Sequence, residues 1–163
     1  MTMAEDWVRE RAEKSLSQMI DWIGRHDSRS AGLMGITVAM MGALSAATPS
    51  VKQWSGIFVV ALSITAIGFG IVLYQLMRGQ IPRIRAGNPS LSFFGSVASM
   101  PQDEFRARFV KMTEQEYLDD VLNQCYVNAR ILRSKFRCLK RGLTALLLTA
   151  IPWAWAISLA KSL

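Results

Sequence analysis

A stripe of polar side chains in the second half of the chain has the residue types needed to bind an anion. Gln124, Asn128 and Lys135 follow one another at steps of four and seven residues, which places them on one face of a helix. Three arginines occur in the same stretch: Arg130, Arg133 and Arg137. Amide and cationic groups together suit a phosphate or a carboxylate. The stripe therefore predicts either an anion-binding groove or a helix face that is simply solvated.

Residues suited to catalysis or to metal binding are scarce. His26 is the only histidine, so a site with several histidine ligands is excluded. Cys125 and Cys138 are 13 positions apart and form no CxxC pair, so we expect reduced thiols. Neither Gly87 nor Gly95 belongs to a phosphate loop that ends in Gly-Lys-Ser/Thr. We expect no catalytic residue, no metal site and no cofactor, and therefore no enzyme.

The elements that must position these groups are set by the apolar residues. Hydrophobic residues make up 51% of the 163 positions and charged residues only 19%, against about 25% charged in a soluble domain. The apolar residues are concentrated in three uncharged runs, at 31–47, 54–77 and 142–160. A bilayer core needs about 20 apolar residues, and a soluble bundle would need charged faces that these runs lack. We expect three transmembrane helices.

The basic residues predict the orientation of these helices. Five of the 19 Lys and Arg residues precede the first run, and 12 lie between the second and the third. The other two are Lys52, between the first two runs, and Lys161, in the tail. Because cytoplasmic loops carry the excess of basic residues, we expect a cytoplasmic N-terminus and an external C-terminus.

The flanking segments carry helical signals. The first 30 residues have apolar side chains at helical spacing, as in an amphipathic helix. A capping box at Thr113 and Glu116 begins a helix that nothing interrupts before Gly142, and we expect it to continue into the third span. In the first span, small residues recur at every fourth position, which suits close helix packing within one chain or between protomers: Ala31, Gly35, Ala39 and Ala43.

The resulting fold class is an all-α integral membrane protein with three transmembrane helices. The N-terminal helix and the segment between spans two and three would form a cytoplasmic helical bundle. The expected domains are a cytoplasmic amphipathic helix (1–30), a two-span transmembrane hairpin (31–77), a cytoplasmic helical region (78–141) and a third transmembrane helix (142–163).

Five short elements, in order, resemble one family of bacterial proteins. They are DSRS at 27–30, LSFFGSVASM at 91–100, the stretch from Phe105 to MTE at 112–114, QCY at 124–126 and KFR at 135–137. Together they are similar to the transmembrane effectors of Pycsar anti-phage systems (PycTM). The first element departs from the pattern, because Arg29 stands where a lysine is expected, which keeps the charge and changes its geometry.

The resemblance implies an effector of the bacterial inner membrane. A partner nucleotide cyclase would make cyclic CMP or cyclic UMP during infection. The effector would bind this messenger on its cytoplasmic helices, with region 78–141 as the sensor region, and would then impair membrane integrity, causing abortive infection. The implied partners are the cyclic nucleotide, the lipid bilayer and further copies of the chain, with no nucleic acid.

The resemblance also implies ligand-binding residues. Candidates for the phosphate are Arg29, Lys135 and Arg137, with Asp27 in the same N-terminal element. Candidates for the base are the rings of Phe94 and Tyr126, which could stack on it, and the carboxamides of Gln124 and Asn128, which could read its edge. Gly95 would allow a close backbone approach. Phe94 equally suits a core position, and Lys135 equally suits an ion pair between helices.

Two other functions remain open from the sequence. An effector gated by a cyclic oligonucleotide would need a larger and more basic pocket. A membrane scaffold or small channel without a ligand would need only the spans and the amphipathic helix.

Overall fold

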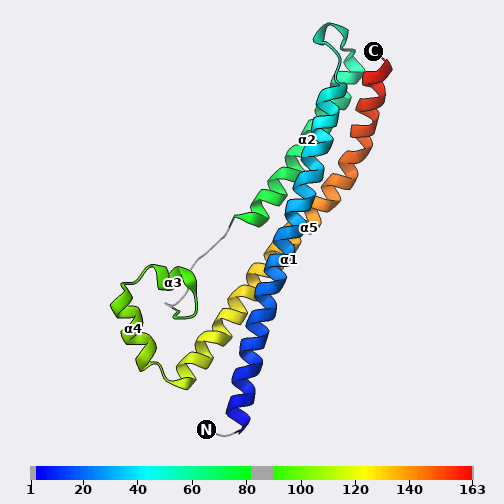
Figure 1. The fold of residues 1–163 in the computed structure, drawn as a ribbon. Helices are drawn as coiled ribbons and strands as arrows, with labels where there is room; N and C mark the ends of the chain where they lie inside the picture. Colours follow the sequence, from blue (N-terminus) through cyan, green and yellow to red (C-terminus); the bar gives the residue numbers. More distant parts are fainter. Residues whose placement is uncertain (1–2, 82–89, 163) are drawn as a thin grey trace. The chain divides into compact units, whose positions relative to one another are not determined.

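A computed structural model gives the structure of residues 3–81 and 90–162, and these residues contain helices and no strand (Figure 1). The elements in chain order are α1 (Met3–Ala47), the short 3₁₀ helix η1 (Val51–Gln53), α2 (Gly56–Gln80), α3 (Phe94–Ala98), α4 (Gln102–Lys111) and α5 (Glu114–Ser162). The predicted all-α class is confirmed.

Three of these helices, α1, α2 and α5, are long and apolar enough to cross a membrane, as predicted. Two of them are much longer than a span requires, with 45 residues in α1 and 49 in α5, against about 20 for a bilayer core. Each joins a charged half to an apolar half without a break. The prediction that the helix beginning after Thr113 continues into the third span is confirmed.

The chain divides into two compact units. Unit 1 consists of Met1–Arg25 and Pro82–Arg133, and unit 2 of His26–Ile81 and Ser134–Leu163. These borders reflect packing. The domain borders expected from the sequence instead mark where the chain would enter or leave the membrane. Those borders stay predictions, as does the cytoplasmic location of unit 1.

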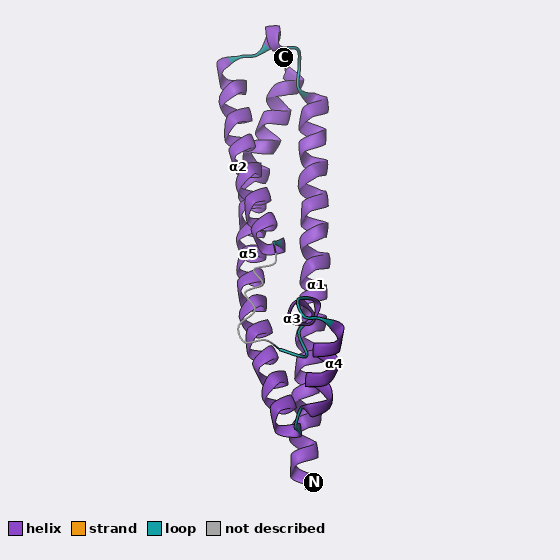
Figure 2. Cartoon of the chain, turned by 90° about the vertical axis from the view of Figure 1, so that its left-hand side faces the viewer, coloured by secondary structure: helices purple, strands orange, loops and turns teal. Residues whose placement is uncertain are grey.

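In unit 2 the apolar halves of α1 and α5 lie beside α2 (Figures 1 and 2). They share one core of buried side chains: Leu44, Ala61, Phe69, Val72, Leu76, Leu146 and Ala156. α2 and α5 approach each other closely at Gly68, where an added Cβ would lie 2.3 Å from Oγ1 of Thr149. Trp153 ties α5 to α1, because its Nε1 donates to the carbonyl of Met40 at 2.9 Å.

The two faces of α1 in unit 2 differ. The buried face carries residues at steps of four and seven: His26, Ser30, Thr37 and Leu44. The predicted small-residue stripe of Ala31, Gly35, Ala39 and Ala43 is exposed, and a Cβ added at Gly35 would meet no atom within 4 Å. This stripe therefore does not supply the contacts of α1 with α2 and α5.

Unit 1 has a thin core between the charged halves of α1 and α5. Ala12, Val121 and Cys125 are its buried residues, with Leu16 and Tyr117 among those packed against them. The edges are polar. The Tyr117 hydroxyl donates to Glu13 at 3.1 Å, and the Cys125 thiol lies 3.6 Å from the carbonyl of Ala12.

The predicted capping box begins α5. The Thr113 N–H donates to the Glu116 carboxylate at 2.8 Å, and the Glu116 N–H donates to the Thr113 hydroxyl at 3.3 Å. The Thr113 hydroxyl also donates to this carboxylate, at 2.9 Å, and the two hydrogen bonds that Thr113 donates lower the pKa of Glu116 below its ordinary value. The bonds of the two N–H groups satisfy helix-end donors that would otherwise lack partners.

Candidate functional site

An ion pair in unit 2 joins α1 to α5. Nζ of Lys135 donates to Oδ1 of Asp27 at 2.5 Å, which fulfils the expectation that Lys135 could pair between helices. The Lys135 side chain is 13% exposed and the Asp27 side chain 39%. Sequence reasoning named both residues as candidates, and the structure brings them together although 108 positions separate them.

His26 extends this cluster and was missed by the sequence reasoning. It is fully buried, and its Nδ1 lies 3.1 Å from the same Asp27 oxygen. Its ring packs edge-on against Phe136, with centroids 5.4 Å apart. The other ring nitrogen, Nε2, is buried without a hydrogen-bond partner among the described residues. The available signal was a lone histidine beside a candidate aspartate where the charged part of the helix gives way to the apolar one.

The cluster keeps Asp27 ionised. Burial alone would raise the pKa of Asp27, but hydrogen bonds and charges from Lys135 and His26 outweigh it and hold this pKa below its ordinary value. Lys135 is therefore paired with a carboxylate, and an incoming anion would compete with Asp27 for it.

The other cation candidates lie apart from this pair. Residues two positions apart on an α-helix point about 200° away from each other. Lys135 points toward α1, whereas Arg137 lines a hollow between α2 and α5. Arg29 is exposed on α1, two positions beyond Asp27. The three cations therefore do not converge on one point of unit 2.

We call the hollow between α2 and α5 the α2–α5 groove. It has a volume of ≈ 720 Å³. One end carries Gln75 and the cations Arg137, Lys140 and Arg141, and the remainder is lined mainly by apolar side chains, including Ile64, Ile67, Ile71 and Leu148. Sequence reasoning missed Lys140 and Arg141 as site residues, although they stand directly before the third uncharged run.

The base-recognition candidates belong to unit 1. Gln124 is buried, at 7% exposed, and Asn128 is half-buried one turn further along α5. Tyr126 is 63% exposed, and the Arg130 guanidinium lies 5.9 Å from the centroid of its ring. Because Gln124 and Tyr126 are two positions apart, they leave α5 on opposite sides.

The aromatic-glycine element forms α3. A Cβ added at Gly95 would lie 2.6 Å from the ring of Phe93, so a side chain at this position would have to displace that ring. In this structure the group close to Gly95 is a ring of its own chain, and the close approach of a ligand at Gly95 stays a prediction. Phe94 begins α3, and its side chain lies outside the described residues.

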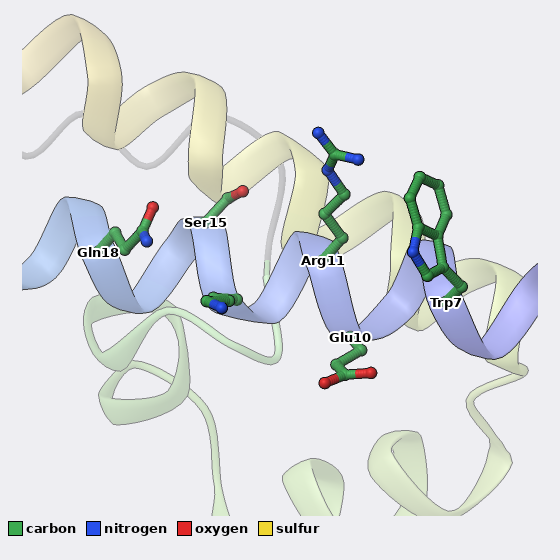
Figure 3. A pocket seen from close by; sticks show the side chains of 6 residues that line it. Trp7, Glu10, Arg11, Ser15 and Gln18 are labelled. Atoms are coloured by element: carbon green, nitrogen blue, oxygen red, sulfur yellow. The ribbon is translucent and has the colours of Figure 1, made fainter.

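A second hollow, of ≈ 430 Å³, runs along the first turns of α1 (Figure 3). Trp7 and Arg11 leave the helix on the same side, with the guanidinium 4.9 Å from the centroid of the Trp7 ring. All six lining residues come from α1: Trp7, Glu10, Arg11, Lys14, Ser15 and Gln18. A face lined by one helix and by charges of both signs is poorly suited to one anion, and it contains no candidate ligand residue.

The described residues contain no group of three or more His, Cys, Asp or Glu side chains that could hold a metal ion. The cluster combines a cation and an imidazole with the Asp27 carboxylate, whereas the groove has three cations, one amide and the hydroxyls of Thr144 and Thr149. The cations of the groove suit it to bind an anion.

Comparison with known proteins identifies the family. A model described as the Pycsar effector protein domain (PycTM) matches residues 11–161. The Pycsar effector protein GmPycTM of Gulbenkiania mobilis is 21% identical over 178 aligned positions, which cover 91% of each chain. No solved structure is significantly similar to the chain. The resemblance seen in five short elements is thereby confirmed over almost the whole length, and the chain belongs to the Pycsar effector family.

Proposed function

We propose that this anti-phage effector binds a cyclic pyrimidine mononucleotide, cyclic CMP or cyclic UMP, and then impairs the membrane, causing abortive infection. Family membership supports the role in defence, and three candidate spans support a membrane location. The proposed location is the bacterial inner membrane, with the N-terminus in the cytoplasm and a nucleotide cyclase as the functional partner.

The Asp27–Lys135 pair is the observation that carries the binding step. The ligand phosphate has one negative charge, as does the carboxylate it would replace, so the exchange leaves Lys135 neutralised. Asp27 is three times as exposed as Lys135, so the carboxylate can move into water while the ammonium group stays in place. The ligand then gains a charge-assisted hydrogen bond in a partly desolvated position.

The remaining candidates stay part of the proposal. Gln124 and Asn128 have carboxamides that both donate and accept hydrogen bonds, as the edge of a pyrimidine does. The exposed ring of Tyr126 offers a stacking surface. Arg29, Phe94, Gly95 and Arg137 are retained from the family elements, and each is tested through its own effect on affinity or on base preference.

The membrane step follows from the position of the pair. Asp27 and Lys135 hold α1 against α5 next to the apolar halves of both helices. Loss of this bond lets the two helices repack. The exposed stripe of Ala31, Gly35, Ala39 and Ala43 supports association with further copies, because small residues let helices approach closely in lipid. Such oligomers would disrupt the bilayer.

Titration calorimetry with the purified full chain tests the binding step. We expect cyclic CMP or cyclic UMP to bind, and linear CMP and cyclic AMP to bind at least about tenfold more weakly, a difference of about 1.4 kcal/mol. Lys135→Ala should abolish this preference, whereas Arg133→Ala, an exposed cation on the same helix, should retain it. Binding of a cyclic dinucleotide alone would favour the oligonucleotide-gated alternative.

Asp27→Asn gives the sharper result. If Asp27 competes with the phosphate, the variant binds the ligand more tightly than the wild type; if Asp27 contacts the ligand, the variant binds it more weakly.

Dye release from liposomes tests the membrane step. Leakage that does not depend on the nucleotide would indicate a channel without a ligand, and absence of leakage would overturn the mechanism.

A further inference from the structure

The α2–α5 groove has two chemically distinct ends. Its cations, Arg137, Lys140 and Arg141, all precede residue 142, where the third uncharged run begins. Its apolar walls lie within the second and third runs, at residues such as Ile64 and Leu148. None of the described residues that line the groove is acidic. The charged end therefore has a net positive charge, and the apolar end lies within the expected spans.

The length of the apolar part matches one leaflet. The nine residues from Thr144 to Pro152 rise by about 12 Å along α5, and the 12 residues from Ile64 to the polar Gln75 rise by about 16 Å along α2. Half of the hydrocarbon core of a bilayer is about 15 Å thick. The apolar walls are also open: Ile67 is 65% exposed and Leu148 66%.

Gln75 supplies an unmet hydrogen bond at the charged end. It lies opposite Gly142, where an added Cβ would be 3.7 Å from the Gln75 Cβ. Its Oε1 is buried and accepts no hydrogen bond from the described residues. A buried carbonyl oxygen without a donor costs stability, and a hydroxyl group on a lipid headgroup would provide that donor.

We propose that the α2–α5 groove binds one anionic phospholipid, with its phosphate at Arg137, Lys140 and Arg141 and an acyl chain along Ile64, Ile67 and Leu148. Three cations at the edge of an apolar groove between transmembrane helices complement an anionic headgroup above its acyl chains. A soluble anion would use the cations and leave the apolar walls uncovered. This site lies apart from the Asp27–Lys135 pair, and it assigns Arg137, a candidate for the nucleotide phosphate, to the lipid phosphate instead.

Native mass spectrometry of the full chain in mild detergent tests the charged end. Phosphatidylglycerol and phosphatidylcholine with identical acyl chains are titrated separately. We expect phosphatidylglycerol to bind at least about tenfold more tightly, because each nearby cation favours an anionic lipid. The triple variant Arg137→Gln/Lys140→Gln/Arg141→Gln should lose this preference. A control with the same charge loss outside the groove, Arg78→Gln/Arg130→Gln/Arg133→Gln, should retain it.

Two single substitutions that change no charge test the apolar end of the groove. Their result does not depend on whether the triple variants fold. Leu148 lines the groove, whereas its neighbour Leu147 is equally exposed, at 64% against 66%, and does not. Leu148→Trp should reduce phosphatidylglycerol binding several-fold, and Leu147→Trp should leave it unchanged. Equal effects of the two variants would overturn the assignment of the acyl chain to the groove.

Three further outcomes would overturn the proposal. Equal affinity of the wild type for the two lipids would remove the anionic preference. Competition by glycerol phosphate as effective as by the intact lipid would assign the cations to a soluble anion. Disulfide formation between chains at Ile67→Cys that is unaffected by phosphatidylglycerol would assign the groove to a second copy of the chain.

Discussion

The helices inside unit 2 of this effector pack in a different way from the helices inside unit 1. Unit 2 has a core of seven buried apolar residues and a glycine contact so close that a methyl group would collide at 2.3 Å. Unit 1 has a core of three buried apolar residues, Ala12, Val121 and Cys125, with a side-chain hydrogen bond between Tyr117 and Glu13 at its edge. Unit 1 therefore has less buried apolar surface holding its helices together and should open at lower cost.

The difference follows from the surroundings expected for each unit. Large side chains of α2, such as Ile57 and Ile67, point outward at 61% and 65% exposure, which costs nothing against lipid. Without a hydrophobic driving force, spans are held by close fit between small residues. For helices in water, as expected for unit 1, burial of the apolar side chains between α1 and α5 itself stabilises the packing. We therefore expect added atoms to damage unit 2 most and removed atoms to damage unit 1 most.

Gly68→Val should have the largest effect. The added atoms collide with Thr149, and we expect a loss of about 3 kcal/mol, at the upper end for overpacked cores. Gly70→Val is the control, because a Cβ at Gly70 meets no atom within 4 Å. Unfolding by a denaturing detergent, followed by circular dichroism, measures both. Equal losses would attribute the effect to the helix backbone rather than to packing.

Val121→Ala should damage unit 1. Val121 is 2% exposed, and removing its two methyl groups should cost about 2 kcal/mol through lost burial and a cavity. Leu122→Ala, at the neighbouring 47% exposed position, should cost less than about 0.5 kcal/mol. Amide hydrogen exchange should accelerate in the unit 1 parts of α1 and α5 and stay unchanged in α2. Equal acceleration in α2 would show that the units open together.

The Asp27–Lys135 pair should contribute a smaller amount. A double-mutant cycle with Asp27→Ala and Lys135→Ala should give a coupling energy of roughly 1–2 kcal/mol, between values for exposed and buried pairs. The exposed Glu104–Arg108 pair of α4 serves as the reference, with an expected coupling of about 0.3–0.5 kcal/mol. Equal coupling energies for the two pairs would mean that partial burial does not strengthen the Asp27–Lys135 ion pair.

The same pair has a predictable response to acid. Because the folded state lowers the pKa of Asp27, the pair stabilises the protein above the ordinary aspartate pKa. This contribution is lost as the pH falls through the lowered value. Acid unfolding curves should therefore differ between the wild type and Asp27→Ala at neutral pH and converge below that value. Curves that stay parallel throughout would contradict the ionised state of Asp27.

Thr113→Ala should have the smallest effect. It removes the hydroxyl that caps α5 and should cost about 1 kcal/mol, with faster hydrogen exchange confined to the first turns of α5. Thr144→Ala is a suitable control, since the hydroxyl of Thr144 donates to the carbonyl of Lys140 in its own helix. Faster amide hydrogen exchange throughout unit 1 in Thr113→Ala would mean that the cap stabilises the whole packing of α1 against α5 in that unit.

The sequence predicted what depends on neighbouring residues. The three apolar runs, the capping box at Thr113 and the continuity of α5 follow from local composition and hydrogen bonding, and they are confirmed. The pairing of Asp27 with Lys135 and the contact of Gly68 with Thr149 depend on the register of distant helices. No local pattern encodes that register, so these contacts required the structure.

The candidate site shows the same limit at shorter range. Gln124 and Tyr126 belong to one three-residue element of the family, yet one side chain is buried and the other exposed. Lys135 and Arg137 also belong to one element and point toward different helices. A sequence motif groups residues that are close along the chain, whereas two residues that are two positions apart on a helix point to nearly opposite sides of it.

The exposed stripe on α1 has a consequence for symmetry. A helix face that packs against the same face of a second copy forms an isologous contact, which is satisfied by two molecules related by a twofold axis. Growth beyond two copies requires a second, different surface, so that the contact becomes head-to-tail and can close into a ring. If copies of this chain associate through the stripe of Ala31, Gly35, Ala39 and Ala43, their number depends on whether the stripe packs against its own image or against another face of the neighbouring molecule.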